Sequence, residues 1–288
     1  HPHPYTDDNQ VDLDSLRRLT QYLIDNSAQG MSPNGGDSEA RYLTEEERMA
    51  ALDAILEANA GRIIILAGCS ATSTAESARL CQHAQSGGAD GVFVMPPEHW
   101  IGTLSTSDVT DASMLAHFAT IAEGLDIPIM VHATANMDVP FLRTLAERIP
   151  TVQYIKEETN HGPKLRKYIA ELGDRLTAFG PGLHYPAELE WGAQGVMPSC
   201  CAANAHARVF DLWKAGEHEQ ARAAWNRMLP LVFWRWHTAP GEAGKWFLTH
   251  EGVFRTHHTR PDFGKHRLDE ADYREMLTIL ATMGGPRY

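Results

Sequence analysis

Cysteine is scarce in this chain of 288 residues, and no motif pairs the few that are present. A secreted domain held together by disulfides needs a denser cysteine framework, and redox or zinc motifs need C-x-x-C spacing, which is absent. The chain is therefore expected to be a cytoplasmic protein with reduced thiols. The four cysteines are Cys69, Cys81, Cys200 and Cys201.

Positive charge and long apolar runs are also lacking. Lysine and arginine number 25 against 37 acidic residues, the net charge is −12, and no basic block stands out. This balance argues against a nucleic-acid partner. No apolar run reaches the roughly 20 residues that cross a bilayer, and no signal peptide is visible, so no membrane partner is expected either.

Motifs for metals and nucleotides are missing as well. The 15 histidines show no HExxH-like spacing, and Cys200-Cys201 has no partner cluster. Pro33-Asn34-Gly35-Gly36 matches neither a phosphate-binding loop nor a dinucleotide fingerprint. No metal site is therefore predicted. Two groups of residues could be imagined as metal ligands, but their spacing matches no known metal motif. They are His257 and His258 with Asp262 and His266, and His1 with His3.

The chain does contain a regular alternation of short apolar runs and helix-like segments. The apolar runs cover residues 63–68, 91–95, 127–132, 152–156, 176–180 and 195–199, and the helical patterns between them cover 74–81, 114–123, 139–148, 163–172 and 185–191. Such runs are typical of parallel strands buried on both faces. Their number favours an α/β protein with a TIM (β/α)8 barrel over an open doubly wound sheet.

The two ends of the chain differ from this middle part. The first residues show no clear apolar run, so the first barrel strand is expected to be short or truncated. From Ala202 onward the pattern is helical, and no linker divides the chain. Residues 1–215 are therefore predicted to form the barrel, and residues 216–288 a C-terminal helical extension packed on it.

Polar residues gather where the predicted strands end, and in a barrel those ends form the rim that carries the active site. Lys156 ends the run Gln153-Tyr154-Ile155-Lys156. Partial desolvation disfavours the charged form of a lysine, which frees an amine that can attack a carbonyl carbon. The alternative is a lysine that caps the strand at the surface, because lysine is rarely buried.

Several motifs follow one another along the chain in a characteristic order: Val11–Leu19, Leu43–Arg48, Gly87–Val92, Tyr154–Glu157 and Gly192–Val196. With these motifs the chain resembles, over nearly its whole length, the dihydrodipicolinate synthase / N-acetylneuraminate lyase family of class I aldolase barrels. The resemblance implies that Lys156 is the nucleophile, on the sixth strand. Its amine would form an imine with pyruvate or a longer 2-oxo acid, and this covalent bond would take the place of a cofactor.

The family's proton-shuttle tyrosine corresponds by counting to His132, at the end of the run 127–132. The resemblance implies that His132 lies on the fifth strand and faces Lys156. Histidine exchanges protons near neutral pH, so the replacement preserves a proton carrier. The alternative is a structural histidine that bonds to backbone.

The family's Gly-Thr-Thr-Gly-Glu substrate loop corresponds here to Gly35, Gly36, Asp37, Ser38 and Glu39. Backbone N–H groups of a glycine-rich turn can hold a carboxylate, which implies a substrate-binding loop. Asp37 brings a negative charge, so it is expected to turn away, cap the next helix or bond a substrate hydroxyl. Ser38 is expected to supply a hydroxyl, and Gly180 and Ser199 to line the opposite wall.

Two further positions depart from the family pattern. Glu98 and His99 replace a tyrosine pair that the family inserts across a subunit interface, which implies a substrate-binding role near an interface of a homo-oligomer, a dimer or a tetramer. Met137 replaces the arginine with which the true synthase grips the carboxylate of its second substrate. Loss of a bidentate clamp argues against synthase activity.

These observations favour a Schiff-base-forming lyase, an aldolase or a dehydratase/deaminase, that acts on a small 2-oxo acid through Lys156. Two alternatives remain. One is 4-hydroxy-tetrahydrodipicolinate (dihydrodipicolinate) synthase itself. The other is a catalytically inactive barrel that binds a small metabolite or a partner, against which the retained lysine argues.

Overall fold

The computed structural model describes residues 1–97, 109–134, 137–159, 161–238, 240–260 and 268–284. The chain forms two compact units. Residues 65–198 make up the first, called here the central unit, and residues 1–64 with 199–288 make up the second, called here the terminal unit.

Parallel strands in chain order form the framework of the central unit. The strands are β2 (Ile64–Gly68, whose first residue belongs to the terminal unit), β3 (Gly91–Val94), β4 (Ile129–Ala133), β5 (Val152–Glu157), β6 (Thr177–Gly180) and β7 (Gly195–Val196). Each pairs in parallel with the next. The helices between them are α3 (Thr74–Gly87), α4 (Asp111–Ala122), α5 (Val139–Arg148), α6 (Gly162–Leu172) and α7 (Ala187–Glu190).

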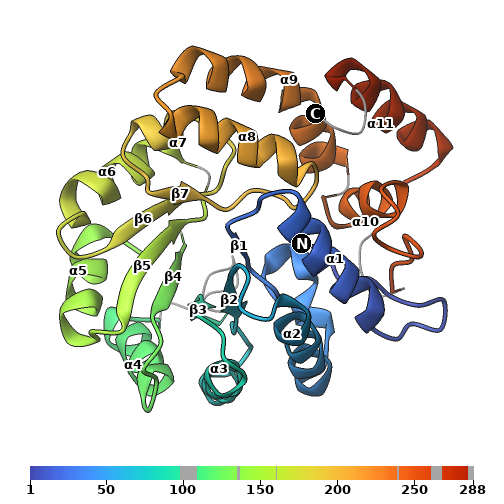
Figure 1. Cartoon of the computed structure of the whole chain (residues 1–288). Coiled ribbons are helices and arrows are strands. Elements are labelled where there is room, and N and C mark those ends of the chain that lie inside the picture. The colour runs from blue at the N-terminus through green and yellow to red at the C-terminus, as the bar shows by residue number, and fades with distance from the viewer. Residues whose placement is uncertain (98–108, 135–136, 160, 239, 261–267, 285–288) are drawn as a thin grey trace. The chain divides into compact units, whose positions relative to one another are not determined.

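This alternation has the strand order of a TIM barrel. In Figure 1, α4, α5 and α6 lie along one side of β4, β5 and β6. Every residue of β3 and β4 is buried, as expected for strands covered on both faces. The predicted strands and helices of this region are therefore confirmed, except that β7 ends at Val196 and does not reach Ser199.

Local signals set the ends of these helices. The side chains of Ser73, Thr110 and Asp138 each accept a hydrogen bond from the third amide of the helix that follows. Such caps satisfy amides that have no partner inside the helix. Gly88 ends α3 with a φ of 88°, a left-handed conformation that glycine adopts without strain.

The terminal unit begins with a turn that folds back on itself. Tyr5 and Val11 form an isolated antiparallel bridge, and the Asp12 amide bonds the Pro4 carbonyl. The side chain of Asp12 then accepts from the Ser15 amide and caps α1 (Leu13–Asp25).

The first described strand therefore follows α1. It is β1 (Gly30–Met31), and beside it the Ile64 amide bonds the Gln29 carbonyl. Among the described residues Lys156 thus lies on the fifth strand and His132 on the fourth. Each number is one lower than predicted, because the prediction counts a first barrel strand before α1, where the described residues form the antiparallel turn.

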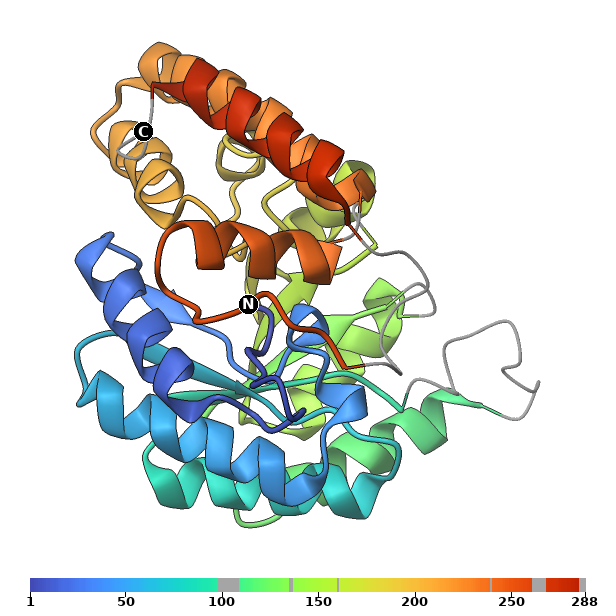
Figure 2. The same cartoon turned by 90° about the vertical axis from the view of Figure 1, so that its right-hand side faces the viewer.

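Helices form the rest of the terminal unit. They are the 3-10 turns η1 (Gly36–Ser38) and η2 (Ala40–Tyr42), and α2 (Glu45–Asn59), α8 (Ala203–Lys214), α9 (His218–Thr238), α10 (Pro240–His250) and α11 (Glu270–Met283). Figure 2 shows α11 lying along α9. The predicted helical C-terminal region is confirmed, whereas its boundary at residue 215 stays a prediction. Among the described residues, no helix combines the length and the apolar character that a bilayer crossing requires.

Candidate functional site

Lys156 is the penultimate residue of β5, and its side chain is 13% exposed. Its Nζ lies 2.6 Å from Oε2 of Glu158 and 5.6 Å from the centre of the Phe93 ring. The amine is thus partly withdrawn from water, between an aromatic face and a carboxylate. Partial burial disfavours the charged form of a lysine, and the carboxylate beside it can accept a proton that the amine releases.

His132 is the residue of β4 that lies directly opposite Lys156 in the parallel ladder. Only 3% of it is exposed, and its ring packs on Phe93 with 4.3 Å between the ring centres. Nε2 of His132 contacts Oε2 of Glu158. Burial lowers the pKa of His132, and the hydrogen bond with Glu158 only partly opposes this effect. The imidazole is therefore neutral near neutral pH.

Glu158 joins the two predicted residues, and sequence reasoning assigned it no role. Burial acts to raise its pKa, but His132 and Lys156 outweigh that effect and hold the pKa at about 2. A carboxylate therefore stands between the two bases at every ordinary pH. The only sequence signal is that Glu158 follows the lysine by two positions, just past the end of β5.

The adjacent Glu157 has a different task. It is buried, and its carboxylate accepts hydrogen bonds from the amides of Thr159 at 2.8 Å and His161 at 3.2 Å. It therefore shapes the turn that leads into α6. The sequence Lys-Glu-Glu does not show which glutamate turns toward the lysine.

Gly180 ends β6 beside a second buried carboxylate. A Cβ at Gly180 would lie 1.9 Å from Oε2 of Glu188, so a side chain cannot fit there. Glu188 is fully buried and accepts from the amides of Gly182 and His184, each at 2.8 Å. Burial raises the pKa of Glu188. Gly180 thus makes room for Glu188, and its predicted substrate contact stays a prediction.

Met137, at the position of the synthase arginine, is almost fully buried. Its amide donates to the carbonyl of Thr134 at 3.1 Å, and its own carbonyl accepts from the hydroxyl of Tyr168 at 2.7 Å. Its side chain cannot bind a carboxylate, so this position offers no clamp for a second acidic substrate.

The predicted substrate loop lies in the terminal unit, where Gly36–Ser38 form the 3-10 turn η1. The hydroxyl of Ser38 accepts from the Gly35 amide at 3.1 Å and donates to the His1 carbonyl at 2.8 Å. Ser38 is buried, so this hydroxyl already serves the structure of the loop.

Asp37 does not cap the next helix. Its carboxylate pairs with the guanidinium of Arg235 on α9. Arg235 is only 5% exposed. Arg235 lies 198 residues further along the chain, so no sequence pattern connects the two. The negative charge that seemed unfavourable in a carboxylate-binding loop is neutralised from within the terminal unit.

Glu39 forms the second ion pair of this loop. Both Glu39 and Lys245, on α10, are fully buried, and Nζ of Lys245 lies 2.7 Å from one carboxylate oxygen and 3.0 Å from the other. Nζ also lies 4.4 Å from the centre of the Tyr5 ring. The loop is thus held at two acidic residues by cations from two C-terminal helices.

The remaining predicted positions are Ser199, Glu98 and His99. Ser199 lies in the terminal unit, where its hydroxyl accepts from the Cys201 amide at 3.1 Å. Because Lys156 belongs to the central unit, the predicted meeting of Ser199 and the substrate loop with Lys156 stays a prediction. Glu98 and His99 lie outside the described residues.

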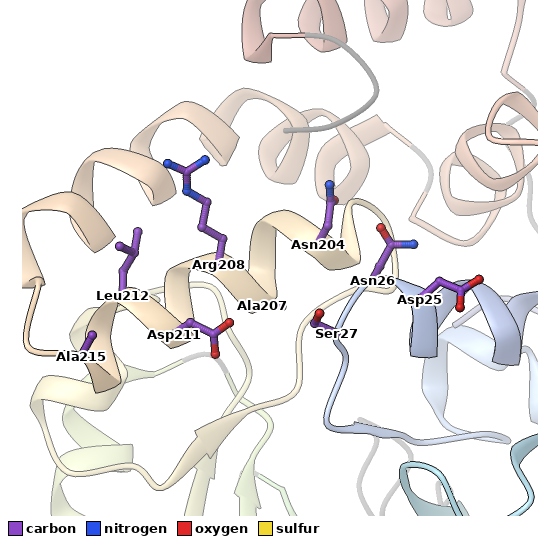
Figure 3. Close-up of a pocket in the computed structure, with 9 residues that line it drawn as sticks. All are labelled: Asp25, Asn26, Ser27, Asn204, Ala207, Arg208, Asp211, Leu212 and Ala215. Atoms are coloured by element: carbon purple, nitrogen blue, oxygen red, sulfur yellow. The ribbon is translucent and has the colours of Figure 1, made fainter.

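A pocket of about 520 Å³ lies in the terminal unit, between the end of α1 and α8 (Figure 3). Arg208 and Asp211 extend from α8 in different directions there. Its lining contains no lysine and none of the predicted site residues, so it offers no amine that could form an imine. In the described part of the chain, no three His, Cys, Asp or Glu side chains cluster as metal ligands would. The pocket is lined by Asp25, Asn26, Ser27, Asn204, Ala207, Arg208, Asp211, Leu212 and Ala215.

Comparison with known proteins identifies relatives of this chain. The pattern of the Dihydrodipicolinate synthetase family matches residues 2–281. An L-2-keto-3-deoxyarabonate dehydratase from Azospirillum brasilense is 31% identical over 80% of this chain and 76% of the relative. A 4-hydroxy-tetrahydrodipicolinate synthase from Rhizobium meliloti (strain 1021) is 26% identical over 79% of this chain and 78% of the relative.

A solved structure agrees in fold. A prophage protein from E. coli K12, described as belonging to the dihydrodipicolinic acid synthase family and solved in complex with pyruvate, superposes with a TM-score of 0.88. The match covers 98% of this chain and 96% of the other, with 23% identity. The expected TIM barrel with C-terminal helices is thereby confirmed. The chain therefore belongs to the dihydrodipicolinate synthetase family and is a Schiff-base lyase with that family's barrel fold.

Proposed function

We propose that this protein is a Schiff-base dehydratase that removes water from a 3-deoxy-2-oxo sugar acid, with Lys156 as nucleophile and His132 as proton carrier. One observation carries the proposal: both side chains reach the same carboxylate oxygen of Glu158 from neighbouring strand ends. The 31% identity to an L-2-keto-3-deoxyarabonate dehydratase supports the substrate class.

The chemistry begins at the ketone carbon, C2. The amine of Lys156 adds to C2, and the oxygen of the ketone leaves as water, so that a protonated imine forms. The positive imine makes the protons on C3 acidic. His132, neutral because of its burial, can take one of them.

The enamine that results carries an electron pair toward C4. That pair expels the C4 hydroxyl, which leaves as water when it receives the proton held by His132. Hydrolysis of the conjugated imine then releases the unsaturated 2-oxo acid and restores the Lys156 amine. The net change is loss of one water, and neither an oxidant nor a reductant is needed.

The same proposal includes how the substrate carboxylate is bound. The loop Gly35–Ser38 is proposed to bind this carboxylate, with Ser199 and Gly180 as further contacts. The neutralised charge of Asp37 removes an objection to this assignment, because a free carboxylate there would repel the substrate. The proposed ligand is a small 2-oxo acid held by a covalent lysine imine.

The synthase alternative has less support. Relatives that carry this name align with the chain at lower identity. Met137, buried at the position of the synthase arginine, cannot hold the carboxylate of a second acidic substrate. An inactive barrel is disfavoured because the lysine, the imidazole and their shared carboxylate are all present.

The deciding experiment is reductive trapping. The full chain is incubated with pyruvate or with 3-deoxy-2-oxo sugar acids, treated with borohydride, and analysed by peptide mass. We expect the label on Lys156, loss of the label in Lys156→Ala, and an unchanged label in Lys167→Ala, which removes an exposed lysine of α6. Product analysis must then show a dehydrated acid. A label elsewhere, or release of pyruvate and an aldehyde, would refute the dehydratase assignment.

A further inference from the structure

We infer that Glu158 is a further catalytic residue: it fixes the His132 ring so that Nδ1 acts as the base, and it stabilises the positive imine on Lys156. This inference rests on the proposed function, because it assigns a role within the same reaction.

One oxygen of Glu158 makes both contacts. Oε2 lies 2.6 Å from Nζ of Lys156 and also contacts Nε2 of His132. This oxygen is buried, although the side chain as a whole is 37% exposed. Because Nζ is the atom that bonds to the substrate, Glu158 touches a reacting atom.

The charge states of the two groups set which ring nitrogen carries the proton. The carboxylate of Glu158 is ionised, because its pKa is held at about 2, and an ionised carboxylate can only accept. Nε2 of the neutral His132 must therefore carry the ring proton. The lone pair of the imidazole is then on Nδ1.

Nδ1 is placed for the role of a base. Among the described residues, neither ring nitrogen meets the geometry of a hydrogen bond, but Nε2 contacts the Glu158 carboxylate, whereas Nδ1 is buried without such a contact. A buried acceptor without a partner costs free energy unless a ligand supplies the missing bond. A C–H bond activated by the imine is a group from which such a nitrogen can take a proton.

Glu158 also balances the charge that develops during the reaction. Imine formation makes the nitrogen of Lys156 permanently positive, and proton uptake makes His132 an imidazolium. A fixed carboxylate in contact with both groups stabilises both cations without rearrangement. The same logic applies in hydrolase triads, where an acidic residue orients the imidazole and stabilises its charged form.

Glu157 cannot replace Glu158 in this role. Its two oxygens already accept from the backbone of Thr159 and His161. The aromatic ring of Phe93 contacts His132 and Lys156, and it offers no proton acceptor of comparable strength.

The test is Glu158→Gln in the full chain, which keeps the size of the side chain and removes its charge. We expect kcat to fall roughly 10²–10⁴-fold, the usual range for acid–base groups. Borohydride should still trap the pyruvate imine at Lys156, but with a lower yield, because the positive imine loses its stabilising carboxylate. The charged groups that act on His132 are Glu158, Lys156 and Glu157. Loss of the Glu158 charge lowers the pKa of His132 further, so the acid limb of kcat/KM must move to lower pH. The matched control is Glu171→Gln, which changes an exposed residue of α6 and must leave all three readouts unchanged.

A wild-type kcat and pH profile in Glu158→Gln would overturn the inference, while the proposed function would stand as long as Lys156 is labelled. Absence of label in the wild-type protein would instead overturn the proposed function. If Glu158→Gln does not fold, Glu158→Asp carries the test, because it retains the charge but withdraws the carboxylate by one methylene. A reduced kcat with an intact label supports the inference, and an unchanged kcat refutes it.

Discussion

Two clusters of paired charges differ in how many partners each carboxylate has. In the terminal unit, Asp37 pairs with Arg235 and Glu39 with Lys245, so each acid has a cation of its own. In the central unit, a single oxygen of Glu158 contacts two bases.

The difference separates a structural arrangement from a reactive one. Glu39 and Lys245 are fully buried, so each charge depends on the other for stabilisation. Lys156 is partly exposed, and Nδ1 of the neighbouring imidazole has no hydrogen-bond partner among the described residues. Charges that balance one to one hold a loop in place, whereas a shared carboxylate leaves proton acceptors available for chemistry.

The strongest test of the comparison is Lys156→Ala. We expect turnover to fall by about 10⁴-fold or more, because the nucleophile is lost, and trapping by pyruvate and borohydride to disappear. Glu158 keeps its contact with His132, so the free energy of unfolding should fall by less than the roughly 3–5 kcal/mol of a broken, fully buried ion pair. Steady-state kinetics and urea unfolding on the same preparation check both statements. A marked loss of stability would mean that Lys156 has a structural role, like Arg235 and Lys245.

His132→Ala should lower kcat roughly 10²–10⁴-fold, since the proton carrier is removed while the nucleophile remains. Imine trapping at Lys156 should survive in part. His132→Tyr should restore measurable activity by returning the family's usual proton carrier. Kinetics and trapping across the three proteins provide the measurement, and full activity in His132→Ala would make the histidine purely structural.

Lys245→Met should have the opposite profile, with a large effect on stability. Removing one partner of a buried ion pair costs about 3–5 kcal/mol, because the remaining charge is left without compensation. Urea unfolding measures the loss, and the double variant Glu39→Gln with Lys245→Met should recover most of it. Lys214→Met, at an exposed position of α8, is the control. A double variant as unstable as the single one would contradict the pairwise interpretation.

The pH dependence of catalysis tests the neutral state of His132. Because burial lowers the pKa of this base, kcat/KM should persist as the pH falls through about 6.5, the ordinary histidine value, and decline only below it. The pH profile of wild-type kcat/KM is the measurement. An acid limb above that value would mean that the protonated imidazole is stabilised after all.

The smallest expected effect concerns stability in acid. Ionisation of Glu158 should increase the free energy of unfolding, whereas ionisation of Glu39 should decrease it. The pKa of Glu158 is depressed from 4.5 to about 2, so its contribution to stability is present above 4.5 and is lost as the pH falls toward 2. Burial raises the pKa of Glu39 despite the nearby Lys245, so ionisation of Glu39 opposes folding as the pH rises. Urea midpoints between those pH values, for the wild type, Glu158→Gln and Glu39→Gln, separate the two. If the urea midpoints of Glu158→Gln and Glu39→Gln changed with pH in the same way, the opposite roles of the two glutamates would be contradicted.

Much of the fold could be predicted from the sequence. Apolar runs of strand length between helical periods mark β2 to β6. The signal is clearest for β3 and β4, because strands buried on both faces admit almost no polar residue. β1 was missed, since two residues are too few to show a pattern. Within the site, the lysine and the histidine stood out because each is a polar residue at the end of an apolar run.

The amino-acid sequence by itself determined the alternation of strands and helices, the place of Lys156 and His132 at neighbouring strand ends, and the acidic character of the loop. Only the tertiary structure decided that Glu158 and not Glu157 joins the two bases, and that Arg235 and Lys245 neutralise Asp37 and Glu39. The physical reason is that strand periodicity is a local property, whereas the partner of a charge depends on side-chain direction and on segments far away in the chain.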